Sequence, residues 1–383
     1  MNKTILWMYE SALIPEKGGT ERITDLIMKG LESRGYTCMA MLELHKDGSI
    51  HYQGNHIADL YKFLIDHNVD VVINQMAYQA WLIDSFLNHG GRKWRNEGGK
   101  IISCLHFDPE QPSYLSLIMS KREKTVNDYW QIVKHSLLWP IYNRRHEMTT
   151  AAVYNHIYDC SDFFVLLSDS HLPYIKRIMH REDYSRFTVI NNPLTFPDIS
   201  FPEILNQKKH QVLIVARMDE YYKRISLALK AWKIIQKKNQ KPRDWQLIVI
   251  GDGPSLQDYK QYVKKQMLSN VIFMGQQSPE PYYRYASIFI MTSSKEGWGL
   301  TLTESLQRGV VPVLMDSCPV FHDIIIDGDN GCYVNDGDVT AMADKIFALM
   351  NNADLLRKYQ QKALISASHF DINNIIDKWI KII

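Results

Sequence analysis

The sequence has few cysteines and no paired cysteine motif. Its 383 residues include five cysteines, which are widely spaced and form no CxxC pair. This usage predicts neither a structural zinc site nor a disulfide framework. A reduced, cytoplasmic setting is therefore the simplest interpretation.

Long apolar runs are also missing. The first strand-like segment holds an apolar run of only five or six residues, which is shorter than a signal peptide requires. No uninterrupted apolar stretch approaches the roughly 18 residues of a membrane span. We expect a cytoplasmic protein that does not cross the membrane, and contact with the inner membrane surface is kept as an alternative.

Neither sign of charge is in excess. The chain has 44 basic and 42 acidic residues, for a net charge of +2. This balance gives no reason to expect a nucleic-acid partner. The phosphate-binding pattern GxxxxGK[ST] is absent too, so the sequence does not indicate a P-loop nucleotidase.

Short apolar runs that alternate with helical patterns dominate the chain. Runs of four to seven apolar residues between turn residues are typical of strands buried on both faces. The expected strands are TILWMYE, CMAML, DVVINQ, IISCLHF, FFVLLS, FTVINN, HQVLIVA, WQLIVIG, VIFMG, IFIMTS and VPVLM. Repeated strand–helix alternation predicts an α/β protein with doubly wound parallel sheets.

The alternation pauses once, in a proline-rich stretch at 193–210. We therefore expect two domains of similar size, 1–195 and 208–367, that face a common cleft. The last helical pattern, 368–383, is expected to pack back on the first domain. In such sheets, ligands bind beyond the carboxyl ends of the strands.

The segment EGWGLTLTE, at 296–304, follows an apolar strand and opens a helix near Thr301. Glycines there allow a ligand to approach the backbone, and a helix N-terminus attracts phosphate. Glu304 can instead close a capping box with Thr301. Glu296 has no such role in this helix, and its carboxylate could accept hydrogen bonds from sugar hydroxyls.

Two cations follow the strand HQVLIVA. Arg217 comes directly after it, and Lys223 lies six positions on. Both fall in one strand-to-helix loop, where they could neutralise a phosphate group through charge-assisted hydrogen bonds. The alternative is an ordinary solvated loop.

Two glycine pairs and one histidine occupy similar places after strands. Gly18 and Gly19 precede a helix near the N-terminus, whereas Gly251 and Gly253 form an incomplete GxGxxG pattern. Each pair is either part of a ligand-binding loop or a tight turn. For Gly251 and Gly253, the turn would precede a helix capped by Ser255. His106 could bind a sugar hydroxyl or transfer a proton, or it is an ordinary loop histidine.

Two Asp-Gly-Asp triplets stand at 327–329 and 336–338. Their carboxylates could hold a divalent metal, but Asp and Gly are typical turn residues. Neither triplet follows an expected buried strand. We interpret both as turns and expect no metal site.

These motifs, in this order, resemble the retaining glycosyltransferases of family 4, which have the GT-B fold. The resemblance covers nearly the whole chain and is strongest at 187–335. It is carried by Glu296 and Glu304, by Arg217 and Lys223, by the Gly18-Gly19 loop, and by the segments IGDGP, VINNPL and IIIDGDNGCYV. Ala216 stands where the family usually has glycine.

The resemblance implies a hexosyltransferase, which transfers a sugar from a nucleotide diphosphate to a hydroxyl. It implies no metal or other cofactor. Arg217 and Lys223 would neutralise the leaving diphosphate, and Glu296 and His106 would contact the donor sugar. The donor-binding set it implies is Gly18, Gly19, Gly251, Gly253, Gly297, Trp298, Gly299, Leu300, Thr301 and Glu304. UDP is favoured over GDP.

The expected function is therefore a step in bacterial cell-surface polysaccharide or lipopolysaccharide biosynthesis, with a glycan or lipid-linked saccharide as acceptor. A nucleotide-sugar epimerase and a non-catalytic nucleotide-sugar-binding protein remain alternatives. An epimerase would need more acid–base groups than His106 and Asp108 supply. The route of retention, by double displacement or by same-face attack, stays open.

The segment 121–147 mixes aromatic residues with an excess of cations. It has six Lys or Arg residues and three acidic ones. A cationic, aromatic helix can lie on an anionic membrane surface. The same pattern also fits an acceptor-domain helix with a solvated basic face.

Overall fold

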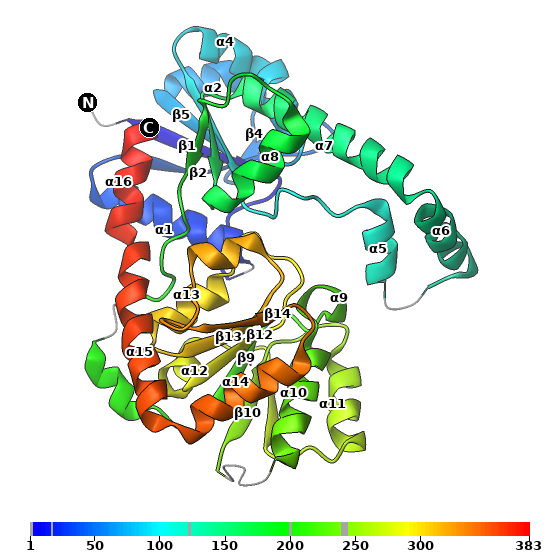
Figure 1. Cartoon of the computed structure of the whole chain (residues 1–383). Coiled ribbons are helices and arrows are strands. Elements are labelled where there is room, and N and C mark those ends of the chain that lie inside the picture. The colour runs from blue at the N-terminus through cyan, green and yellow to red at the C-terminus, as the bar shows by residue number, and fades with distance from the viewer. Residues whose placement is uncertain (1–2, 17, 122–123, 199–200, 239–243) are drawn as a thin grey trace. The chain divides into compact units, whose positions relative to one another are not determined.

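The computed structural model describes residues 3–16, 18–121, 124–198, 201–238 and 244–383. The chain divides into two compact units (Figure 1). Unit 1 contains residues 1–113, 133–195 and 370–383, and unit 2 contains 114–132 and 196–369. Both are layered α/β structures, as the strand–helix alternation predicts.

Unit 1 is built on an eight-stranded sheet in the order β4-β3-β2-β1-β5-β6-β7-β8. The strands are β1 (Thr4–Tyr9), β2 (Thr37–Leu44), β3 (Ile50–Tyr52), β4 (Asn55–His56), β5 (Val69–Asn74), β6 (Lys100–Leu105), β7 (Phe163–Leu166) and β8 (Phe187–Val189). All neighbouring pairs are parallel except β2–β3 and β3–β4.

Helices accompany this sheet. They are α1 (Gly19–Ser33), α2 (Leu60–Asp66), α3 (Ala80–Phe86), α4 (Arg92–Asn96), α7 (Trp139–Cys160), α8 (Leu172–Met179) and α16 (Ile372–Ile382). The apolar faces of α2, α3, α4, α7 and α8 form one core with the strands. Helices α1 and α16 also bury apolar residues, and the central strands are apolar on both sides.

Helix α16 joins unit 1 although it follows unit 2 in the chain. Its buried residues are Ile375, Ile376, Trp379 and Ile382, the helical spacing of one apolar face. It packs beside α1 (Figure 1), where Arg34 pairs with Asp377 at 3.0 Å. Lys100 Nζ also donates to the carbonyl of Ile382 at 3.1 Å.

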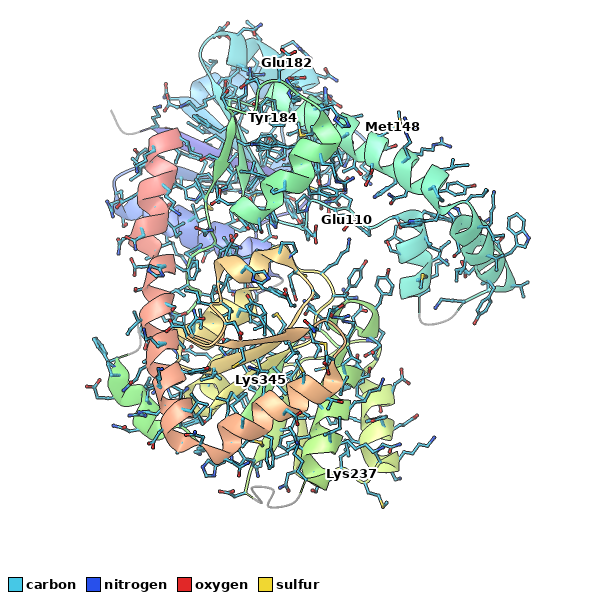
Figure 2. All side chains as sticks on the ribbon, in the orientation of Figure 1. Glu110, Met148, Glu182, Tyr184, Lys237 and Lys345 are labelled. Carbon is cyan, nitrogen blue, oxygen red and sulfur yellow. The ribbon has the colours of Figure 1, made fainter. Side chains whose placement is uncertain are left out.

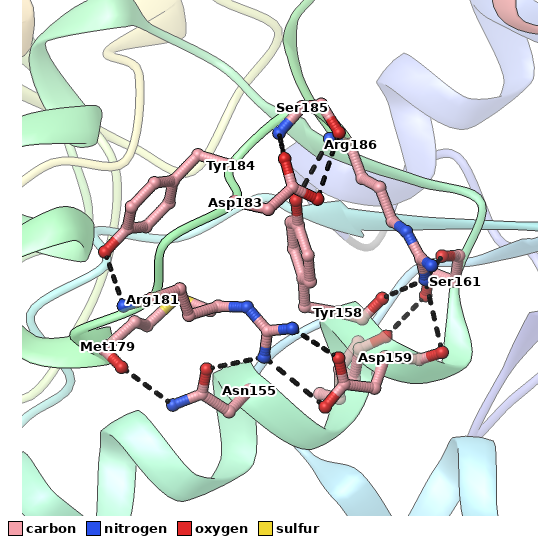
Figure 3. Close-up of polar contacts among 11 residues, drawn as sticks. Asn155, Tyr158, Asp159, Ser161, Met179, Arg181, Asp183, Tyr184, Ser185 and Arg186 are labelled. Atoms are coloured by element: carbon pink, nitrogen blue, oxygen red, sulfur yellow. Dashed lines mark hydrogen bonds and ion pairs between the residues drawn. The ribbon is translucent and has the colours of Figure 1, made fainter.

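Two arginines fix the segment that leads into β8 (Figure 3). Arg181 pairs with Asp159 at 2.6 Å and donates to Asn155 Oδ1 at 2.9 Å. Arg186 donates to the carbonyl oxygens of Tyr158 and Ser161 at 3.1 and 2.8 Å. The bonds from Arg186 satisfy carbonyls at the end of α7, where a helix leaves carbonyl groups without internal partners.

Unit 2 has a six-stranded, fully parallel sheet in the order β11-β10-β9-β12-β13-β14. Its strands are β9 (Gln211–Val215), β10 (Gln246–Ile250), β11 (Val271–Gly275), β12 (Ile288–Met291), β13 (Val311–Asp316) and β14 (Cys332–Asn335). Its helices are α5 (Tyr114–Ser120), α9 (Glu220–Lys223), α10 (Ile225–Lys237), α11 (Leu256–Lys265), α12 (Glu280–Tyr285), α13 (Leu300–Gln307), α14 (Val339–Asn351) and α15 (Ala353–Ala367). The unit boundary falls inside α6 (Val126–Leu137).

All eleven expected strands are present. Three further strands, β3, β4 and β14, were not expected, and they have only two to four residues each. Each of these is too short for an alternating or apolar run to stand out from a loop.

Each sheet reverses its winding direction at one place. In unit 1 this switch point lies between β1 and β5, and in unit 2 it lies between β9 and β12. Loops diverge there at the carboxyl edge of the sheet, which leaves a crevice suited to ligands. The fold therefore indicates where each unit should carry its functional residues.

Candidate functional site

The switch point of unit 2 carries the two expected cations. Arg217 lies just beyond β9 and is exposed, and its guanidinium makes no hydrogen bond or ion pair with the residues that the structure describes. Lys223 ends the short helix α9 in the same loop. An uncommitted cation beside a strand end is available to an anionic ligand.

Lys223 forms an ion pair with Glu296. The side chains keep only 24% and 14% of their surface exposed. Glu296 comes from the loop after β12, so the pair joins the two strands that flank the switch point. The solvated-loop interpretation of Lys223 is therefore wrong, because the ammonium group is held in a defined place.

Backbone contacts hold these two loops together. The amide of Ser294 donates to the carbonyl of Tyr222 at 2.7 Å, and the hydroxyl of Thr292 donates to the carbonyl of Lys223 at 2.7 Å. Arg224 Nε donates to the carbonyl of Thr292 at 2.8 Å. These bonds fix the backbone of both loops, so the side chains of Lys223 and Glu296 project from a rigid backbone.

Arg224 is a residue that the sequence analysis missed. It adopts a left-handed conformation with φ +48°, between α9 and α10. Its guanidinium reaches Asp336 at 2.5 Å and the carbonyl of Ser293 at 3.2 Å. The backbone strain of this position is offset by these bonds, so Arg224 positions the loop, whereas Lys223 beside it faces the site.

Gly251 and Gly253 support the same region from the loop after β10. Their φ angles are +128° and +155°. A Cβ at Gly251 would lie 1.9 Å from the carbonyl oxygen of Ala216, and one at Gly253 would lie 2.7 Å from that of Met218. The glycines therefore let this loop close against the loop of Arg217, where the Met218 amide donates to the Asp252 carbonyl at 2.9 Å.

The helix after β12 begins one residue earlier than expected, at Leu300. Gly299 is its N-cap, with φ +93°, and no side chain caps it. Thr301 lies inside the helix, so the predicted capping box of Thr301 and Glu304 is wrong. Glu304 is 1% exposed and Trp298 3% exposed. The amides that open this helix are thus not capped by a side chain, which suits a phosphate.

The Asp-Gly-Asp triplets serve as turns and caps. Asp338 caps α14 by accepting from the Ala341 amide at 2.8 Å, and Asp327 accepts from the Tyr333 amide at 2.8 Å. The expectation that neither triplet follows a strand is wrong for the second, which follows β14 directly. Across the described ranges, no group of three His, Cys, Asp or Glu side chains could hold a metal ion. Similarly, Ser255 precedes α11 without capping it and accepts from the Glu220 amide at 3.2 Å.

Unit 1 carries its own candidates at its switch point. Gly18 is the N-cap of α1, and Gly19 is the first residue of that helix, in the connection that follows β1. A Cβ at Gly18 would meet Glu21 Oε2 at 2.5 Å. No side chain caps the helix at Gly18, so this N-terminus can also face an anion.

His106 follows β6, and its Nε2 hydrogen-bonds to Gln75 Oε1. Gln75 comes directly after β5 and is buried. His106 keeps part of its surface open, but burial of the ring lowers its pKa to about 4. The ring is therefore neutral near pH 7, and the bond to an amide oxygen favours a proton on Nε2, which leaves Nδ1 as an acceptor.

Gln75 is a second residue that the sequence analysis missed. It has the same signal as Arg217, since it is a polar residue placed directly after a buried strand. Most of the expected site residues lie in unit 2, in the loops after β9, β10 and β12 and in α13. They are Arg217, Lys223, Glu296, Gly251, Gly253, Gly297, Trp298, Gly299, Leu300, Thr301 and Glu304. Gly18, Gly19 and His106 lie in unit 1.

Comparison with known proteins shows what this chain is similar to. Residues 195–364 match the family described as "Glycosyl transferases group 1". The chain is 23% identical over 265 residues to the poly(glycerol-phosphate) alpha-glucosyltransferase of Bacillus subtilis, covering 68% of this chain and 38% of that protein. It is 27% identical over 228 residues, 59% of this chain and 61% of the relative, to the GalNAc-alpha-(1->4)-GalNAc-alpha-(1->3)-diNAcBac-PP-undecaprenol alpha-1,4-N-acetyl-D-galactosaminyltransferase of Campylobacter jejuni.

A solved structure matches the whole chain. Anabaena Alr3699/HepE in complex with UDP superimposes with a TM-score of 0.69 at 14% identity, over 100% of this chain and 99% of the other. The expected GT-B fold, with two Rossmann-like domains, is thereby confirmed. The chain spans less than two thirds of the two curated relatives above.

The approach of Gly251 to Ala216 can be tested by substitution. Gly251→Ala should lower the free energy of unfolding by at least about 2 kcal/mol, because the new Cβ meets a carbonyl oxygen and φ +128° is strained for alanine. Chemical denaturation measures the loss. Gly337→Ala is the control, since it has φ +79° with open space around it. Equal losses in both variants would contradict the close approach.

The contact between Gln75 and His106 can be tested by changing one atom. Gln75→Glu puts a carboxylate against Nε2, which should raise the pKa of His106 by one pH unit or more above about 4. An NMR titration of the His106 ring measures it. Gln79→Glu, which is nearby and faces Trp81, is the control. An unchanged titration in Gln75→Glu would show that the two side chains do not meet.

Proposed function

Because residues 195–364 match the family described as "Glycosyl transferases group 1", we propose that this chain is a retaining, metal-independent hexosyltransferase of family 4. It moves a sugar from a nucleotide diphosphate, UDP in preference to GDP, to a hydroxyl. The acceptor is a glycan or a lipid-linked saccharide of bacterial cell-surface polysaccharide biosynthesis. The two curated relatives support this choice, since one name gives a poly(glycerol-phosphate) acceptor and the other an undecaprenol-linked one.

One observation carries the proposal: Lys223 and Glu296 meet at the switch point of unit 2, beside the exposed Arg217. Cleavage of the bond between sugar and diphosphate builds negative charge on the leaving oxygen. Fixed cations aimed at that charge stabilise the transition state more than the ground state. Arg217 and Lys223 supply this charge from side chains, with the amides at Leu300 and Thr301 adding the positive end of a helix.

The carboxylates divide between the hydroxyl groups of the donor. Glu296 accepts hydrogen bonds from the sugar, and Glu304, in the first turns of α13, takes the ribose diol. Glu296 is held by Lys223, so the donor meets a cation and a carboxylate that are already placed. Preorganisation of this kind lowers the ordering cost of binding.

His106 has a different role from the cations. As a neutral ring it accepts a hydrogen bond from a sugar hydroxyl through Nδ1, and it does not act as an acid near pH 7. Asp108 Oδ1 accepts from the Glu110 amide at 2.8 Å, which is a turn contact and favours same-face attack over a nucleophilic Asp108.

Retention of configuration has independent support. Both curated relatives are named for alpha-linked products. Sugars of the UDP-glucose type are alpha-linked to the diphosphate, so an alpha product means that the configuration is kept. NMR of the new glycosidic linkage would establish this for the present chain.

A panel of UDP- and GDP-sugars, incubated with and without lipid-linked and glycan acceptors, tests the proposal. We expect donor consumption only when an acceptor is present, and no loss of rate with EDTA. Interconversion of the donor sugar without acceptor would identify an epimerase. Tight binding without turnover would identify a binding protein.

Lys223→Ala should lower turnover about 100-fold, if the ammonium group contributes about 3 kcal/mol to the transition state. Steady-state kinetics with saturating donor measures this. Lys230→Ala, an exposed position on α10, is the matched control and should keep the wild-type rate. A fall of less than about threefold in Lys223→Ala would mean that Lys223 does not serve the leaving group.

A further inference from the structure

Helix α6 presents an apolar face to solvent. Val126, Trp130, Val133 and Leu137 are 88%, 60%, 58% and 77% exposed. Their spacing of four, three and four residues places them on one side of the helix. A run of large exposed apolar residues on one helix face marks an interaction surface.

The opposite side of α6 is anchored. Asp128 is buried, accepts from the Thr125 amide at 2.8 Å and pairs with Lys121 at 2.9 Å. His135 is also buried and stacks on Tyr142 at the start of α7, with ring centroids 3.9 Å apart. These contacts fix the rotation of the helix, so its apolar face stays outward.

Other large apolar side chains close to α6 in sequence are exposed too. Tyr129, on the flank of the stripe, is 60% exposed. Met148 projects from α7 (Figure 2) and is 64% exposed. Further exposed apolar side chains close in sequence are Tyr114, Leu117, Met119, Leu138, Trp139 and Ile141.

The charges around this stripe are mainly positive. Lys124 precedes α6, and Arg144 and Arg145 are found on α7, where both are exposed. Of the carboxylates that the structure describes nearby, Asp128 pairs with Lys121 and Glu147 pairs with Arg177 at 3.0 Å. Residues 122 and 123 of the segment 121–147 lie outside the described residues.

We propose that α6 docks on an anionic lipid surface. Its 12 residues span about 18 Å, and its apolar face would enter the boundary between headgroups and acyl chains while the flanking cations meet lipid phosphates. Trp and Tyr are suited to this boundary, because one end of each ring system is apolar and the other polar. None of the helices in the described ranges combines the length and apolar character needed to cross a bilayer.

A second copy of the chain fits this face less well. Two-fold pairing would bring the same surface of both copies together, including Arg144 and Arg145. Like charges at an interface oppose association, whereas anionic lipid attracts them. The charge pattern therefore selects a membrane as the occupant.

Membrane docking through α6 would serve the proposed function, and this part of the inference rests on that function. An enzyme that acts on a lipid-linked saccharide must reach a substrate held at a bilayer. Docking through α6 would confine the search for that acceptor to two dimensions. The binding itself needs no catalysis, so it can be measured separately from transfer.

Vesicle sedimentation tests the proposal with the full chain. The wild type should bind vesicles of phosphatidylcholine with roughly one third phosphatidylglycerol at low salt, and bind pure phosphatidylcholine much less. The double variant Trp130→Glu with Val133→Glu should bind the anionic vesicles at least about tenfold more weakly. Ile365→Glu, at an exposed apolar position on α15, is the matched control and should bind as the wild type does.

Brominated lipids give a second readout that does not depend on a charge change. They should quench part of the tryptophan fluorescence, and Trp130→Phe should remove part of that quenching. Circular dichroism checks that each variant is folded.

Three results would overturn the proposal. They are no wild-type binding to anionic vesicles at low salt, equal binding by the double variant, and a dimer in sedimentation velocity that the double variant abolishes without any vesicle binding. Vesicle binding together with a failed donor panel would instead reject the proposed function and leave the membrane site intact.

Discussion

The order of strands in unit 2 is the constraint on which the site depends. Parallel pairing places β12 directly beside β9, although more than seventy residues separate Lys223 from Glu296. Both strands end at the same edge, so their loops meet and a cation and a carboxylate form an ion pair. The glycines after β10 lie against the loop of Arg217, and the guanidinium of Arg224 bonds to the loop that leads to Glu296. Each local feature would be unremarkable alone, and the sheet makes them one site.

The strands of both sheets could be predicted from the sequence because buried parallel strands consist of short apolar runs. This signal is strong for strands such as β5 and β10. It also located Arg217, Lys223 and Glu296, since each follows a strand. It could not foresee that two of them pair, because the order of strands is a property of the tertiary fold. The capping box failed for a related reason: Gly299 adopts φ +93°, and only the backbone conformation decides where α13 begins.

The segment after β6 could not be interpreted from its sequence pattern alone. Its helices carry many exposed apolar residues, so their periodicity points to a surface and not to the core. His106, at the start of the same segment, depends on Gln75 for its orientation, and a single polar residue after a strand gives no hint of its partner. Burial lowers the pKa of the ring, which is therefore neutral near pH 7, whereas unit 2 supplies the guanidinium of Arg217 and the ammonium of Lys223. The two units thus offer different chemistry: hydrogen bonding without charge from one, and charge compensation from the other.

Helix α16 has a consequence for biogenesis. Its apolar face completes unit 1, yet the ribosome makes this helix only after all of unit 2. During synthesis, unit 1 must therefore wait with an uncovered hydrophobic strip along α1, while unit 2 can fold as soon as it emerges. The unit whose synthesis begins first is therefore the one completed last.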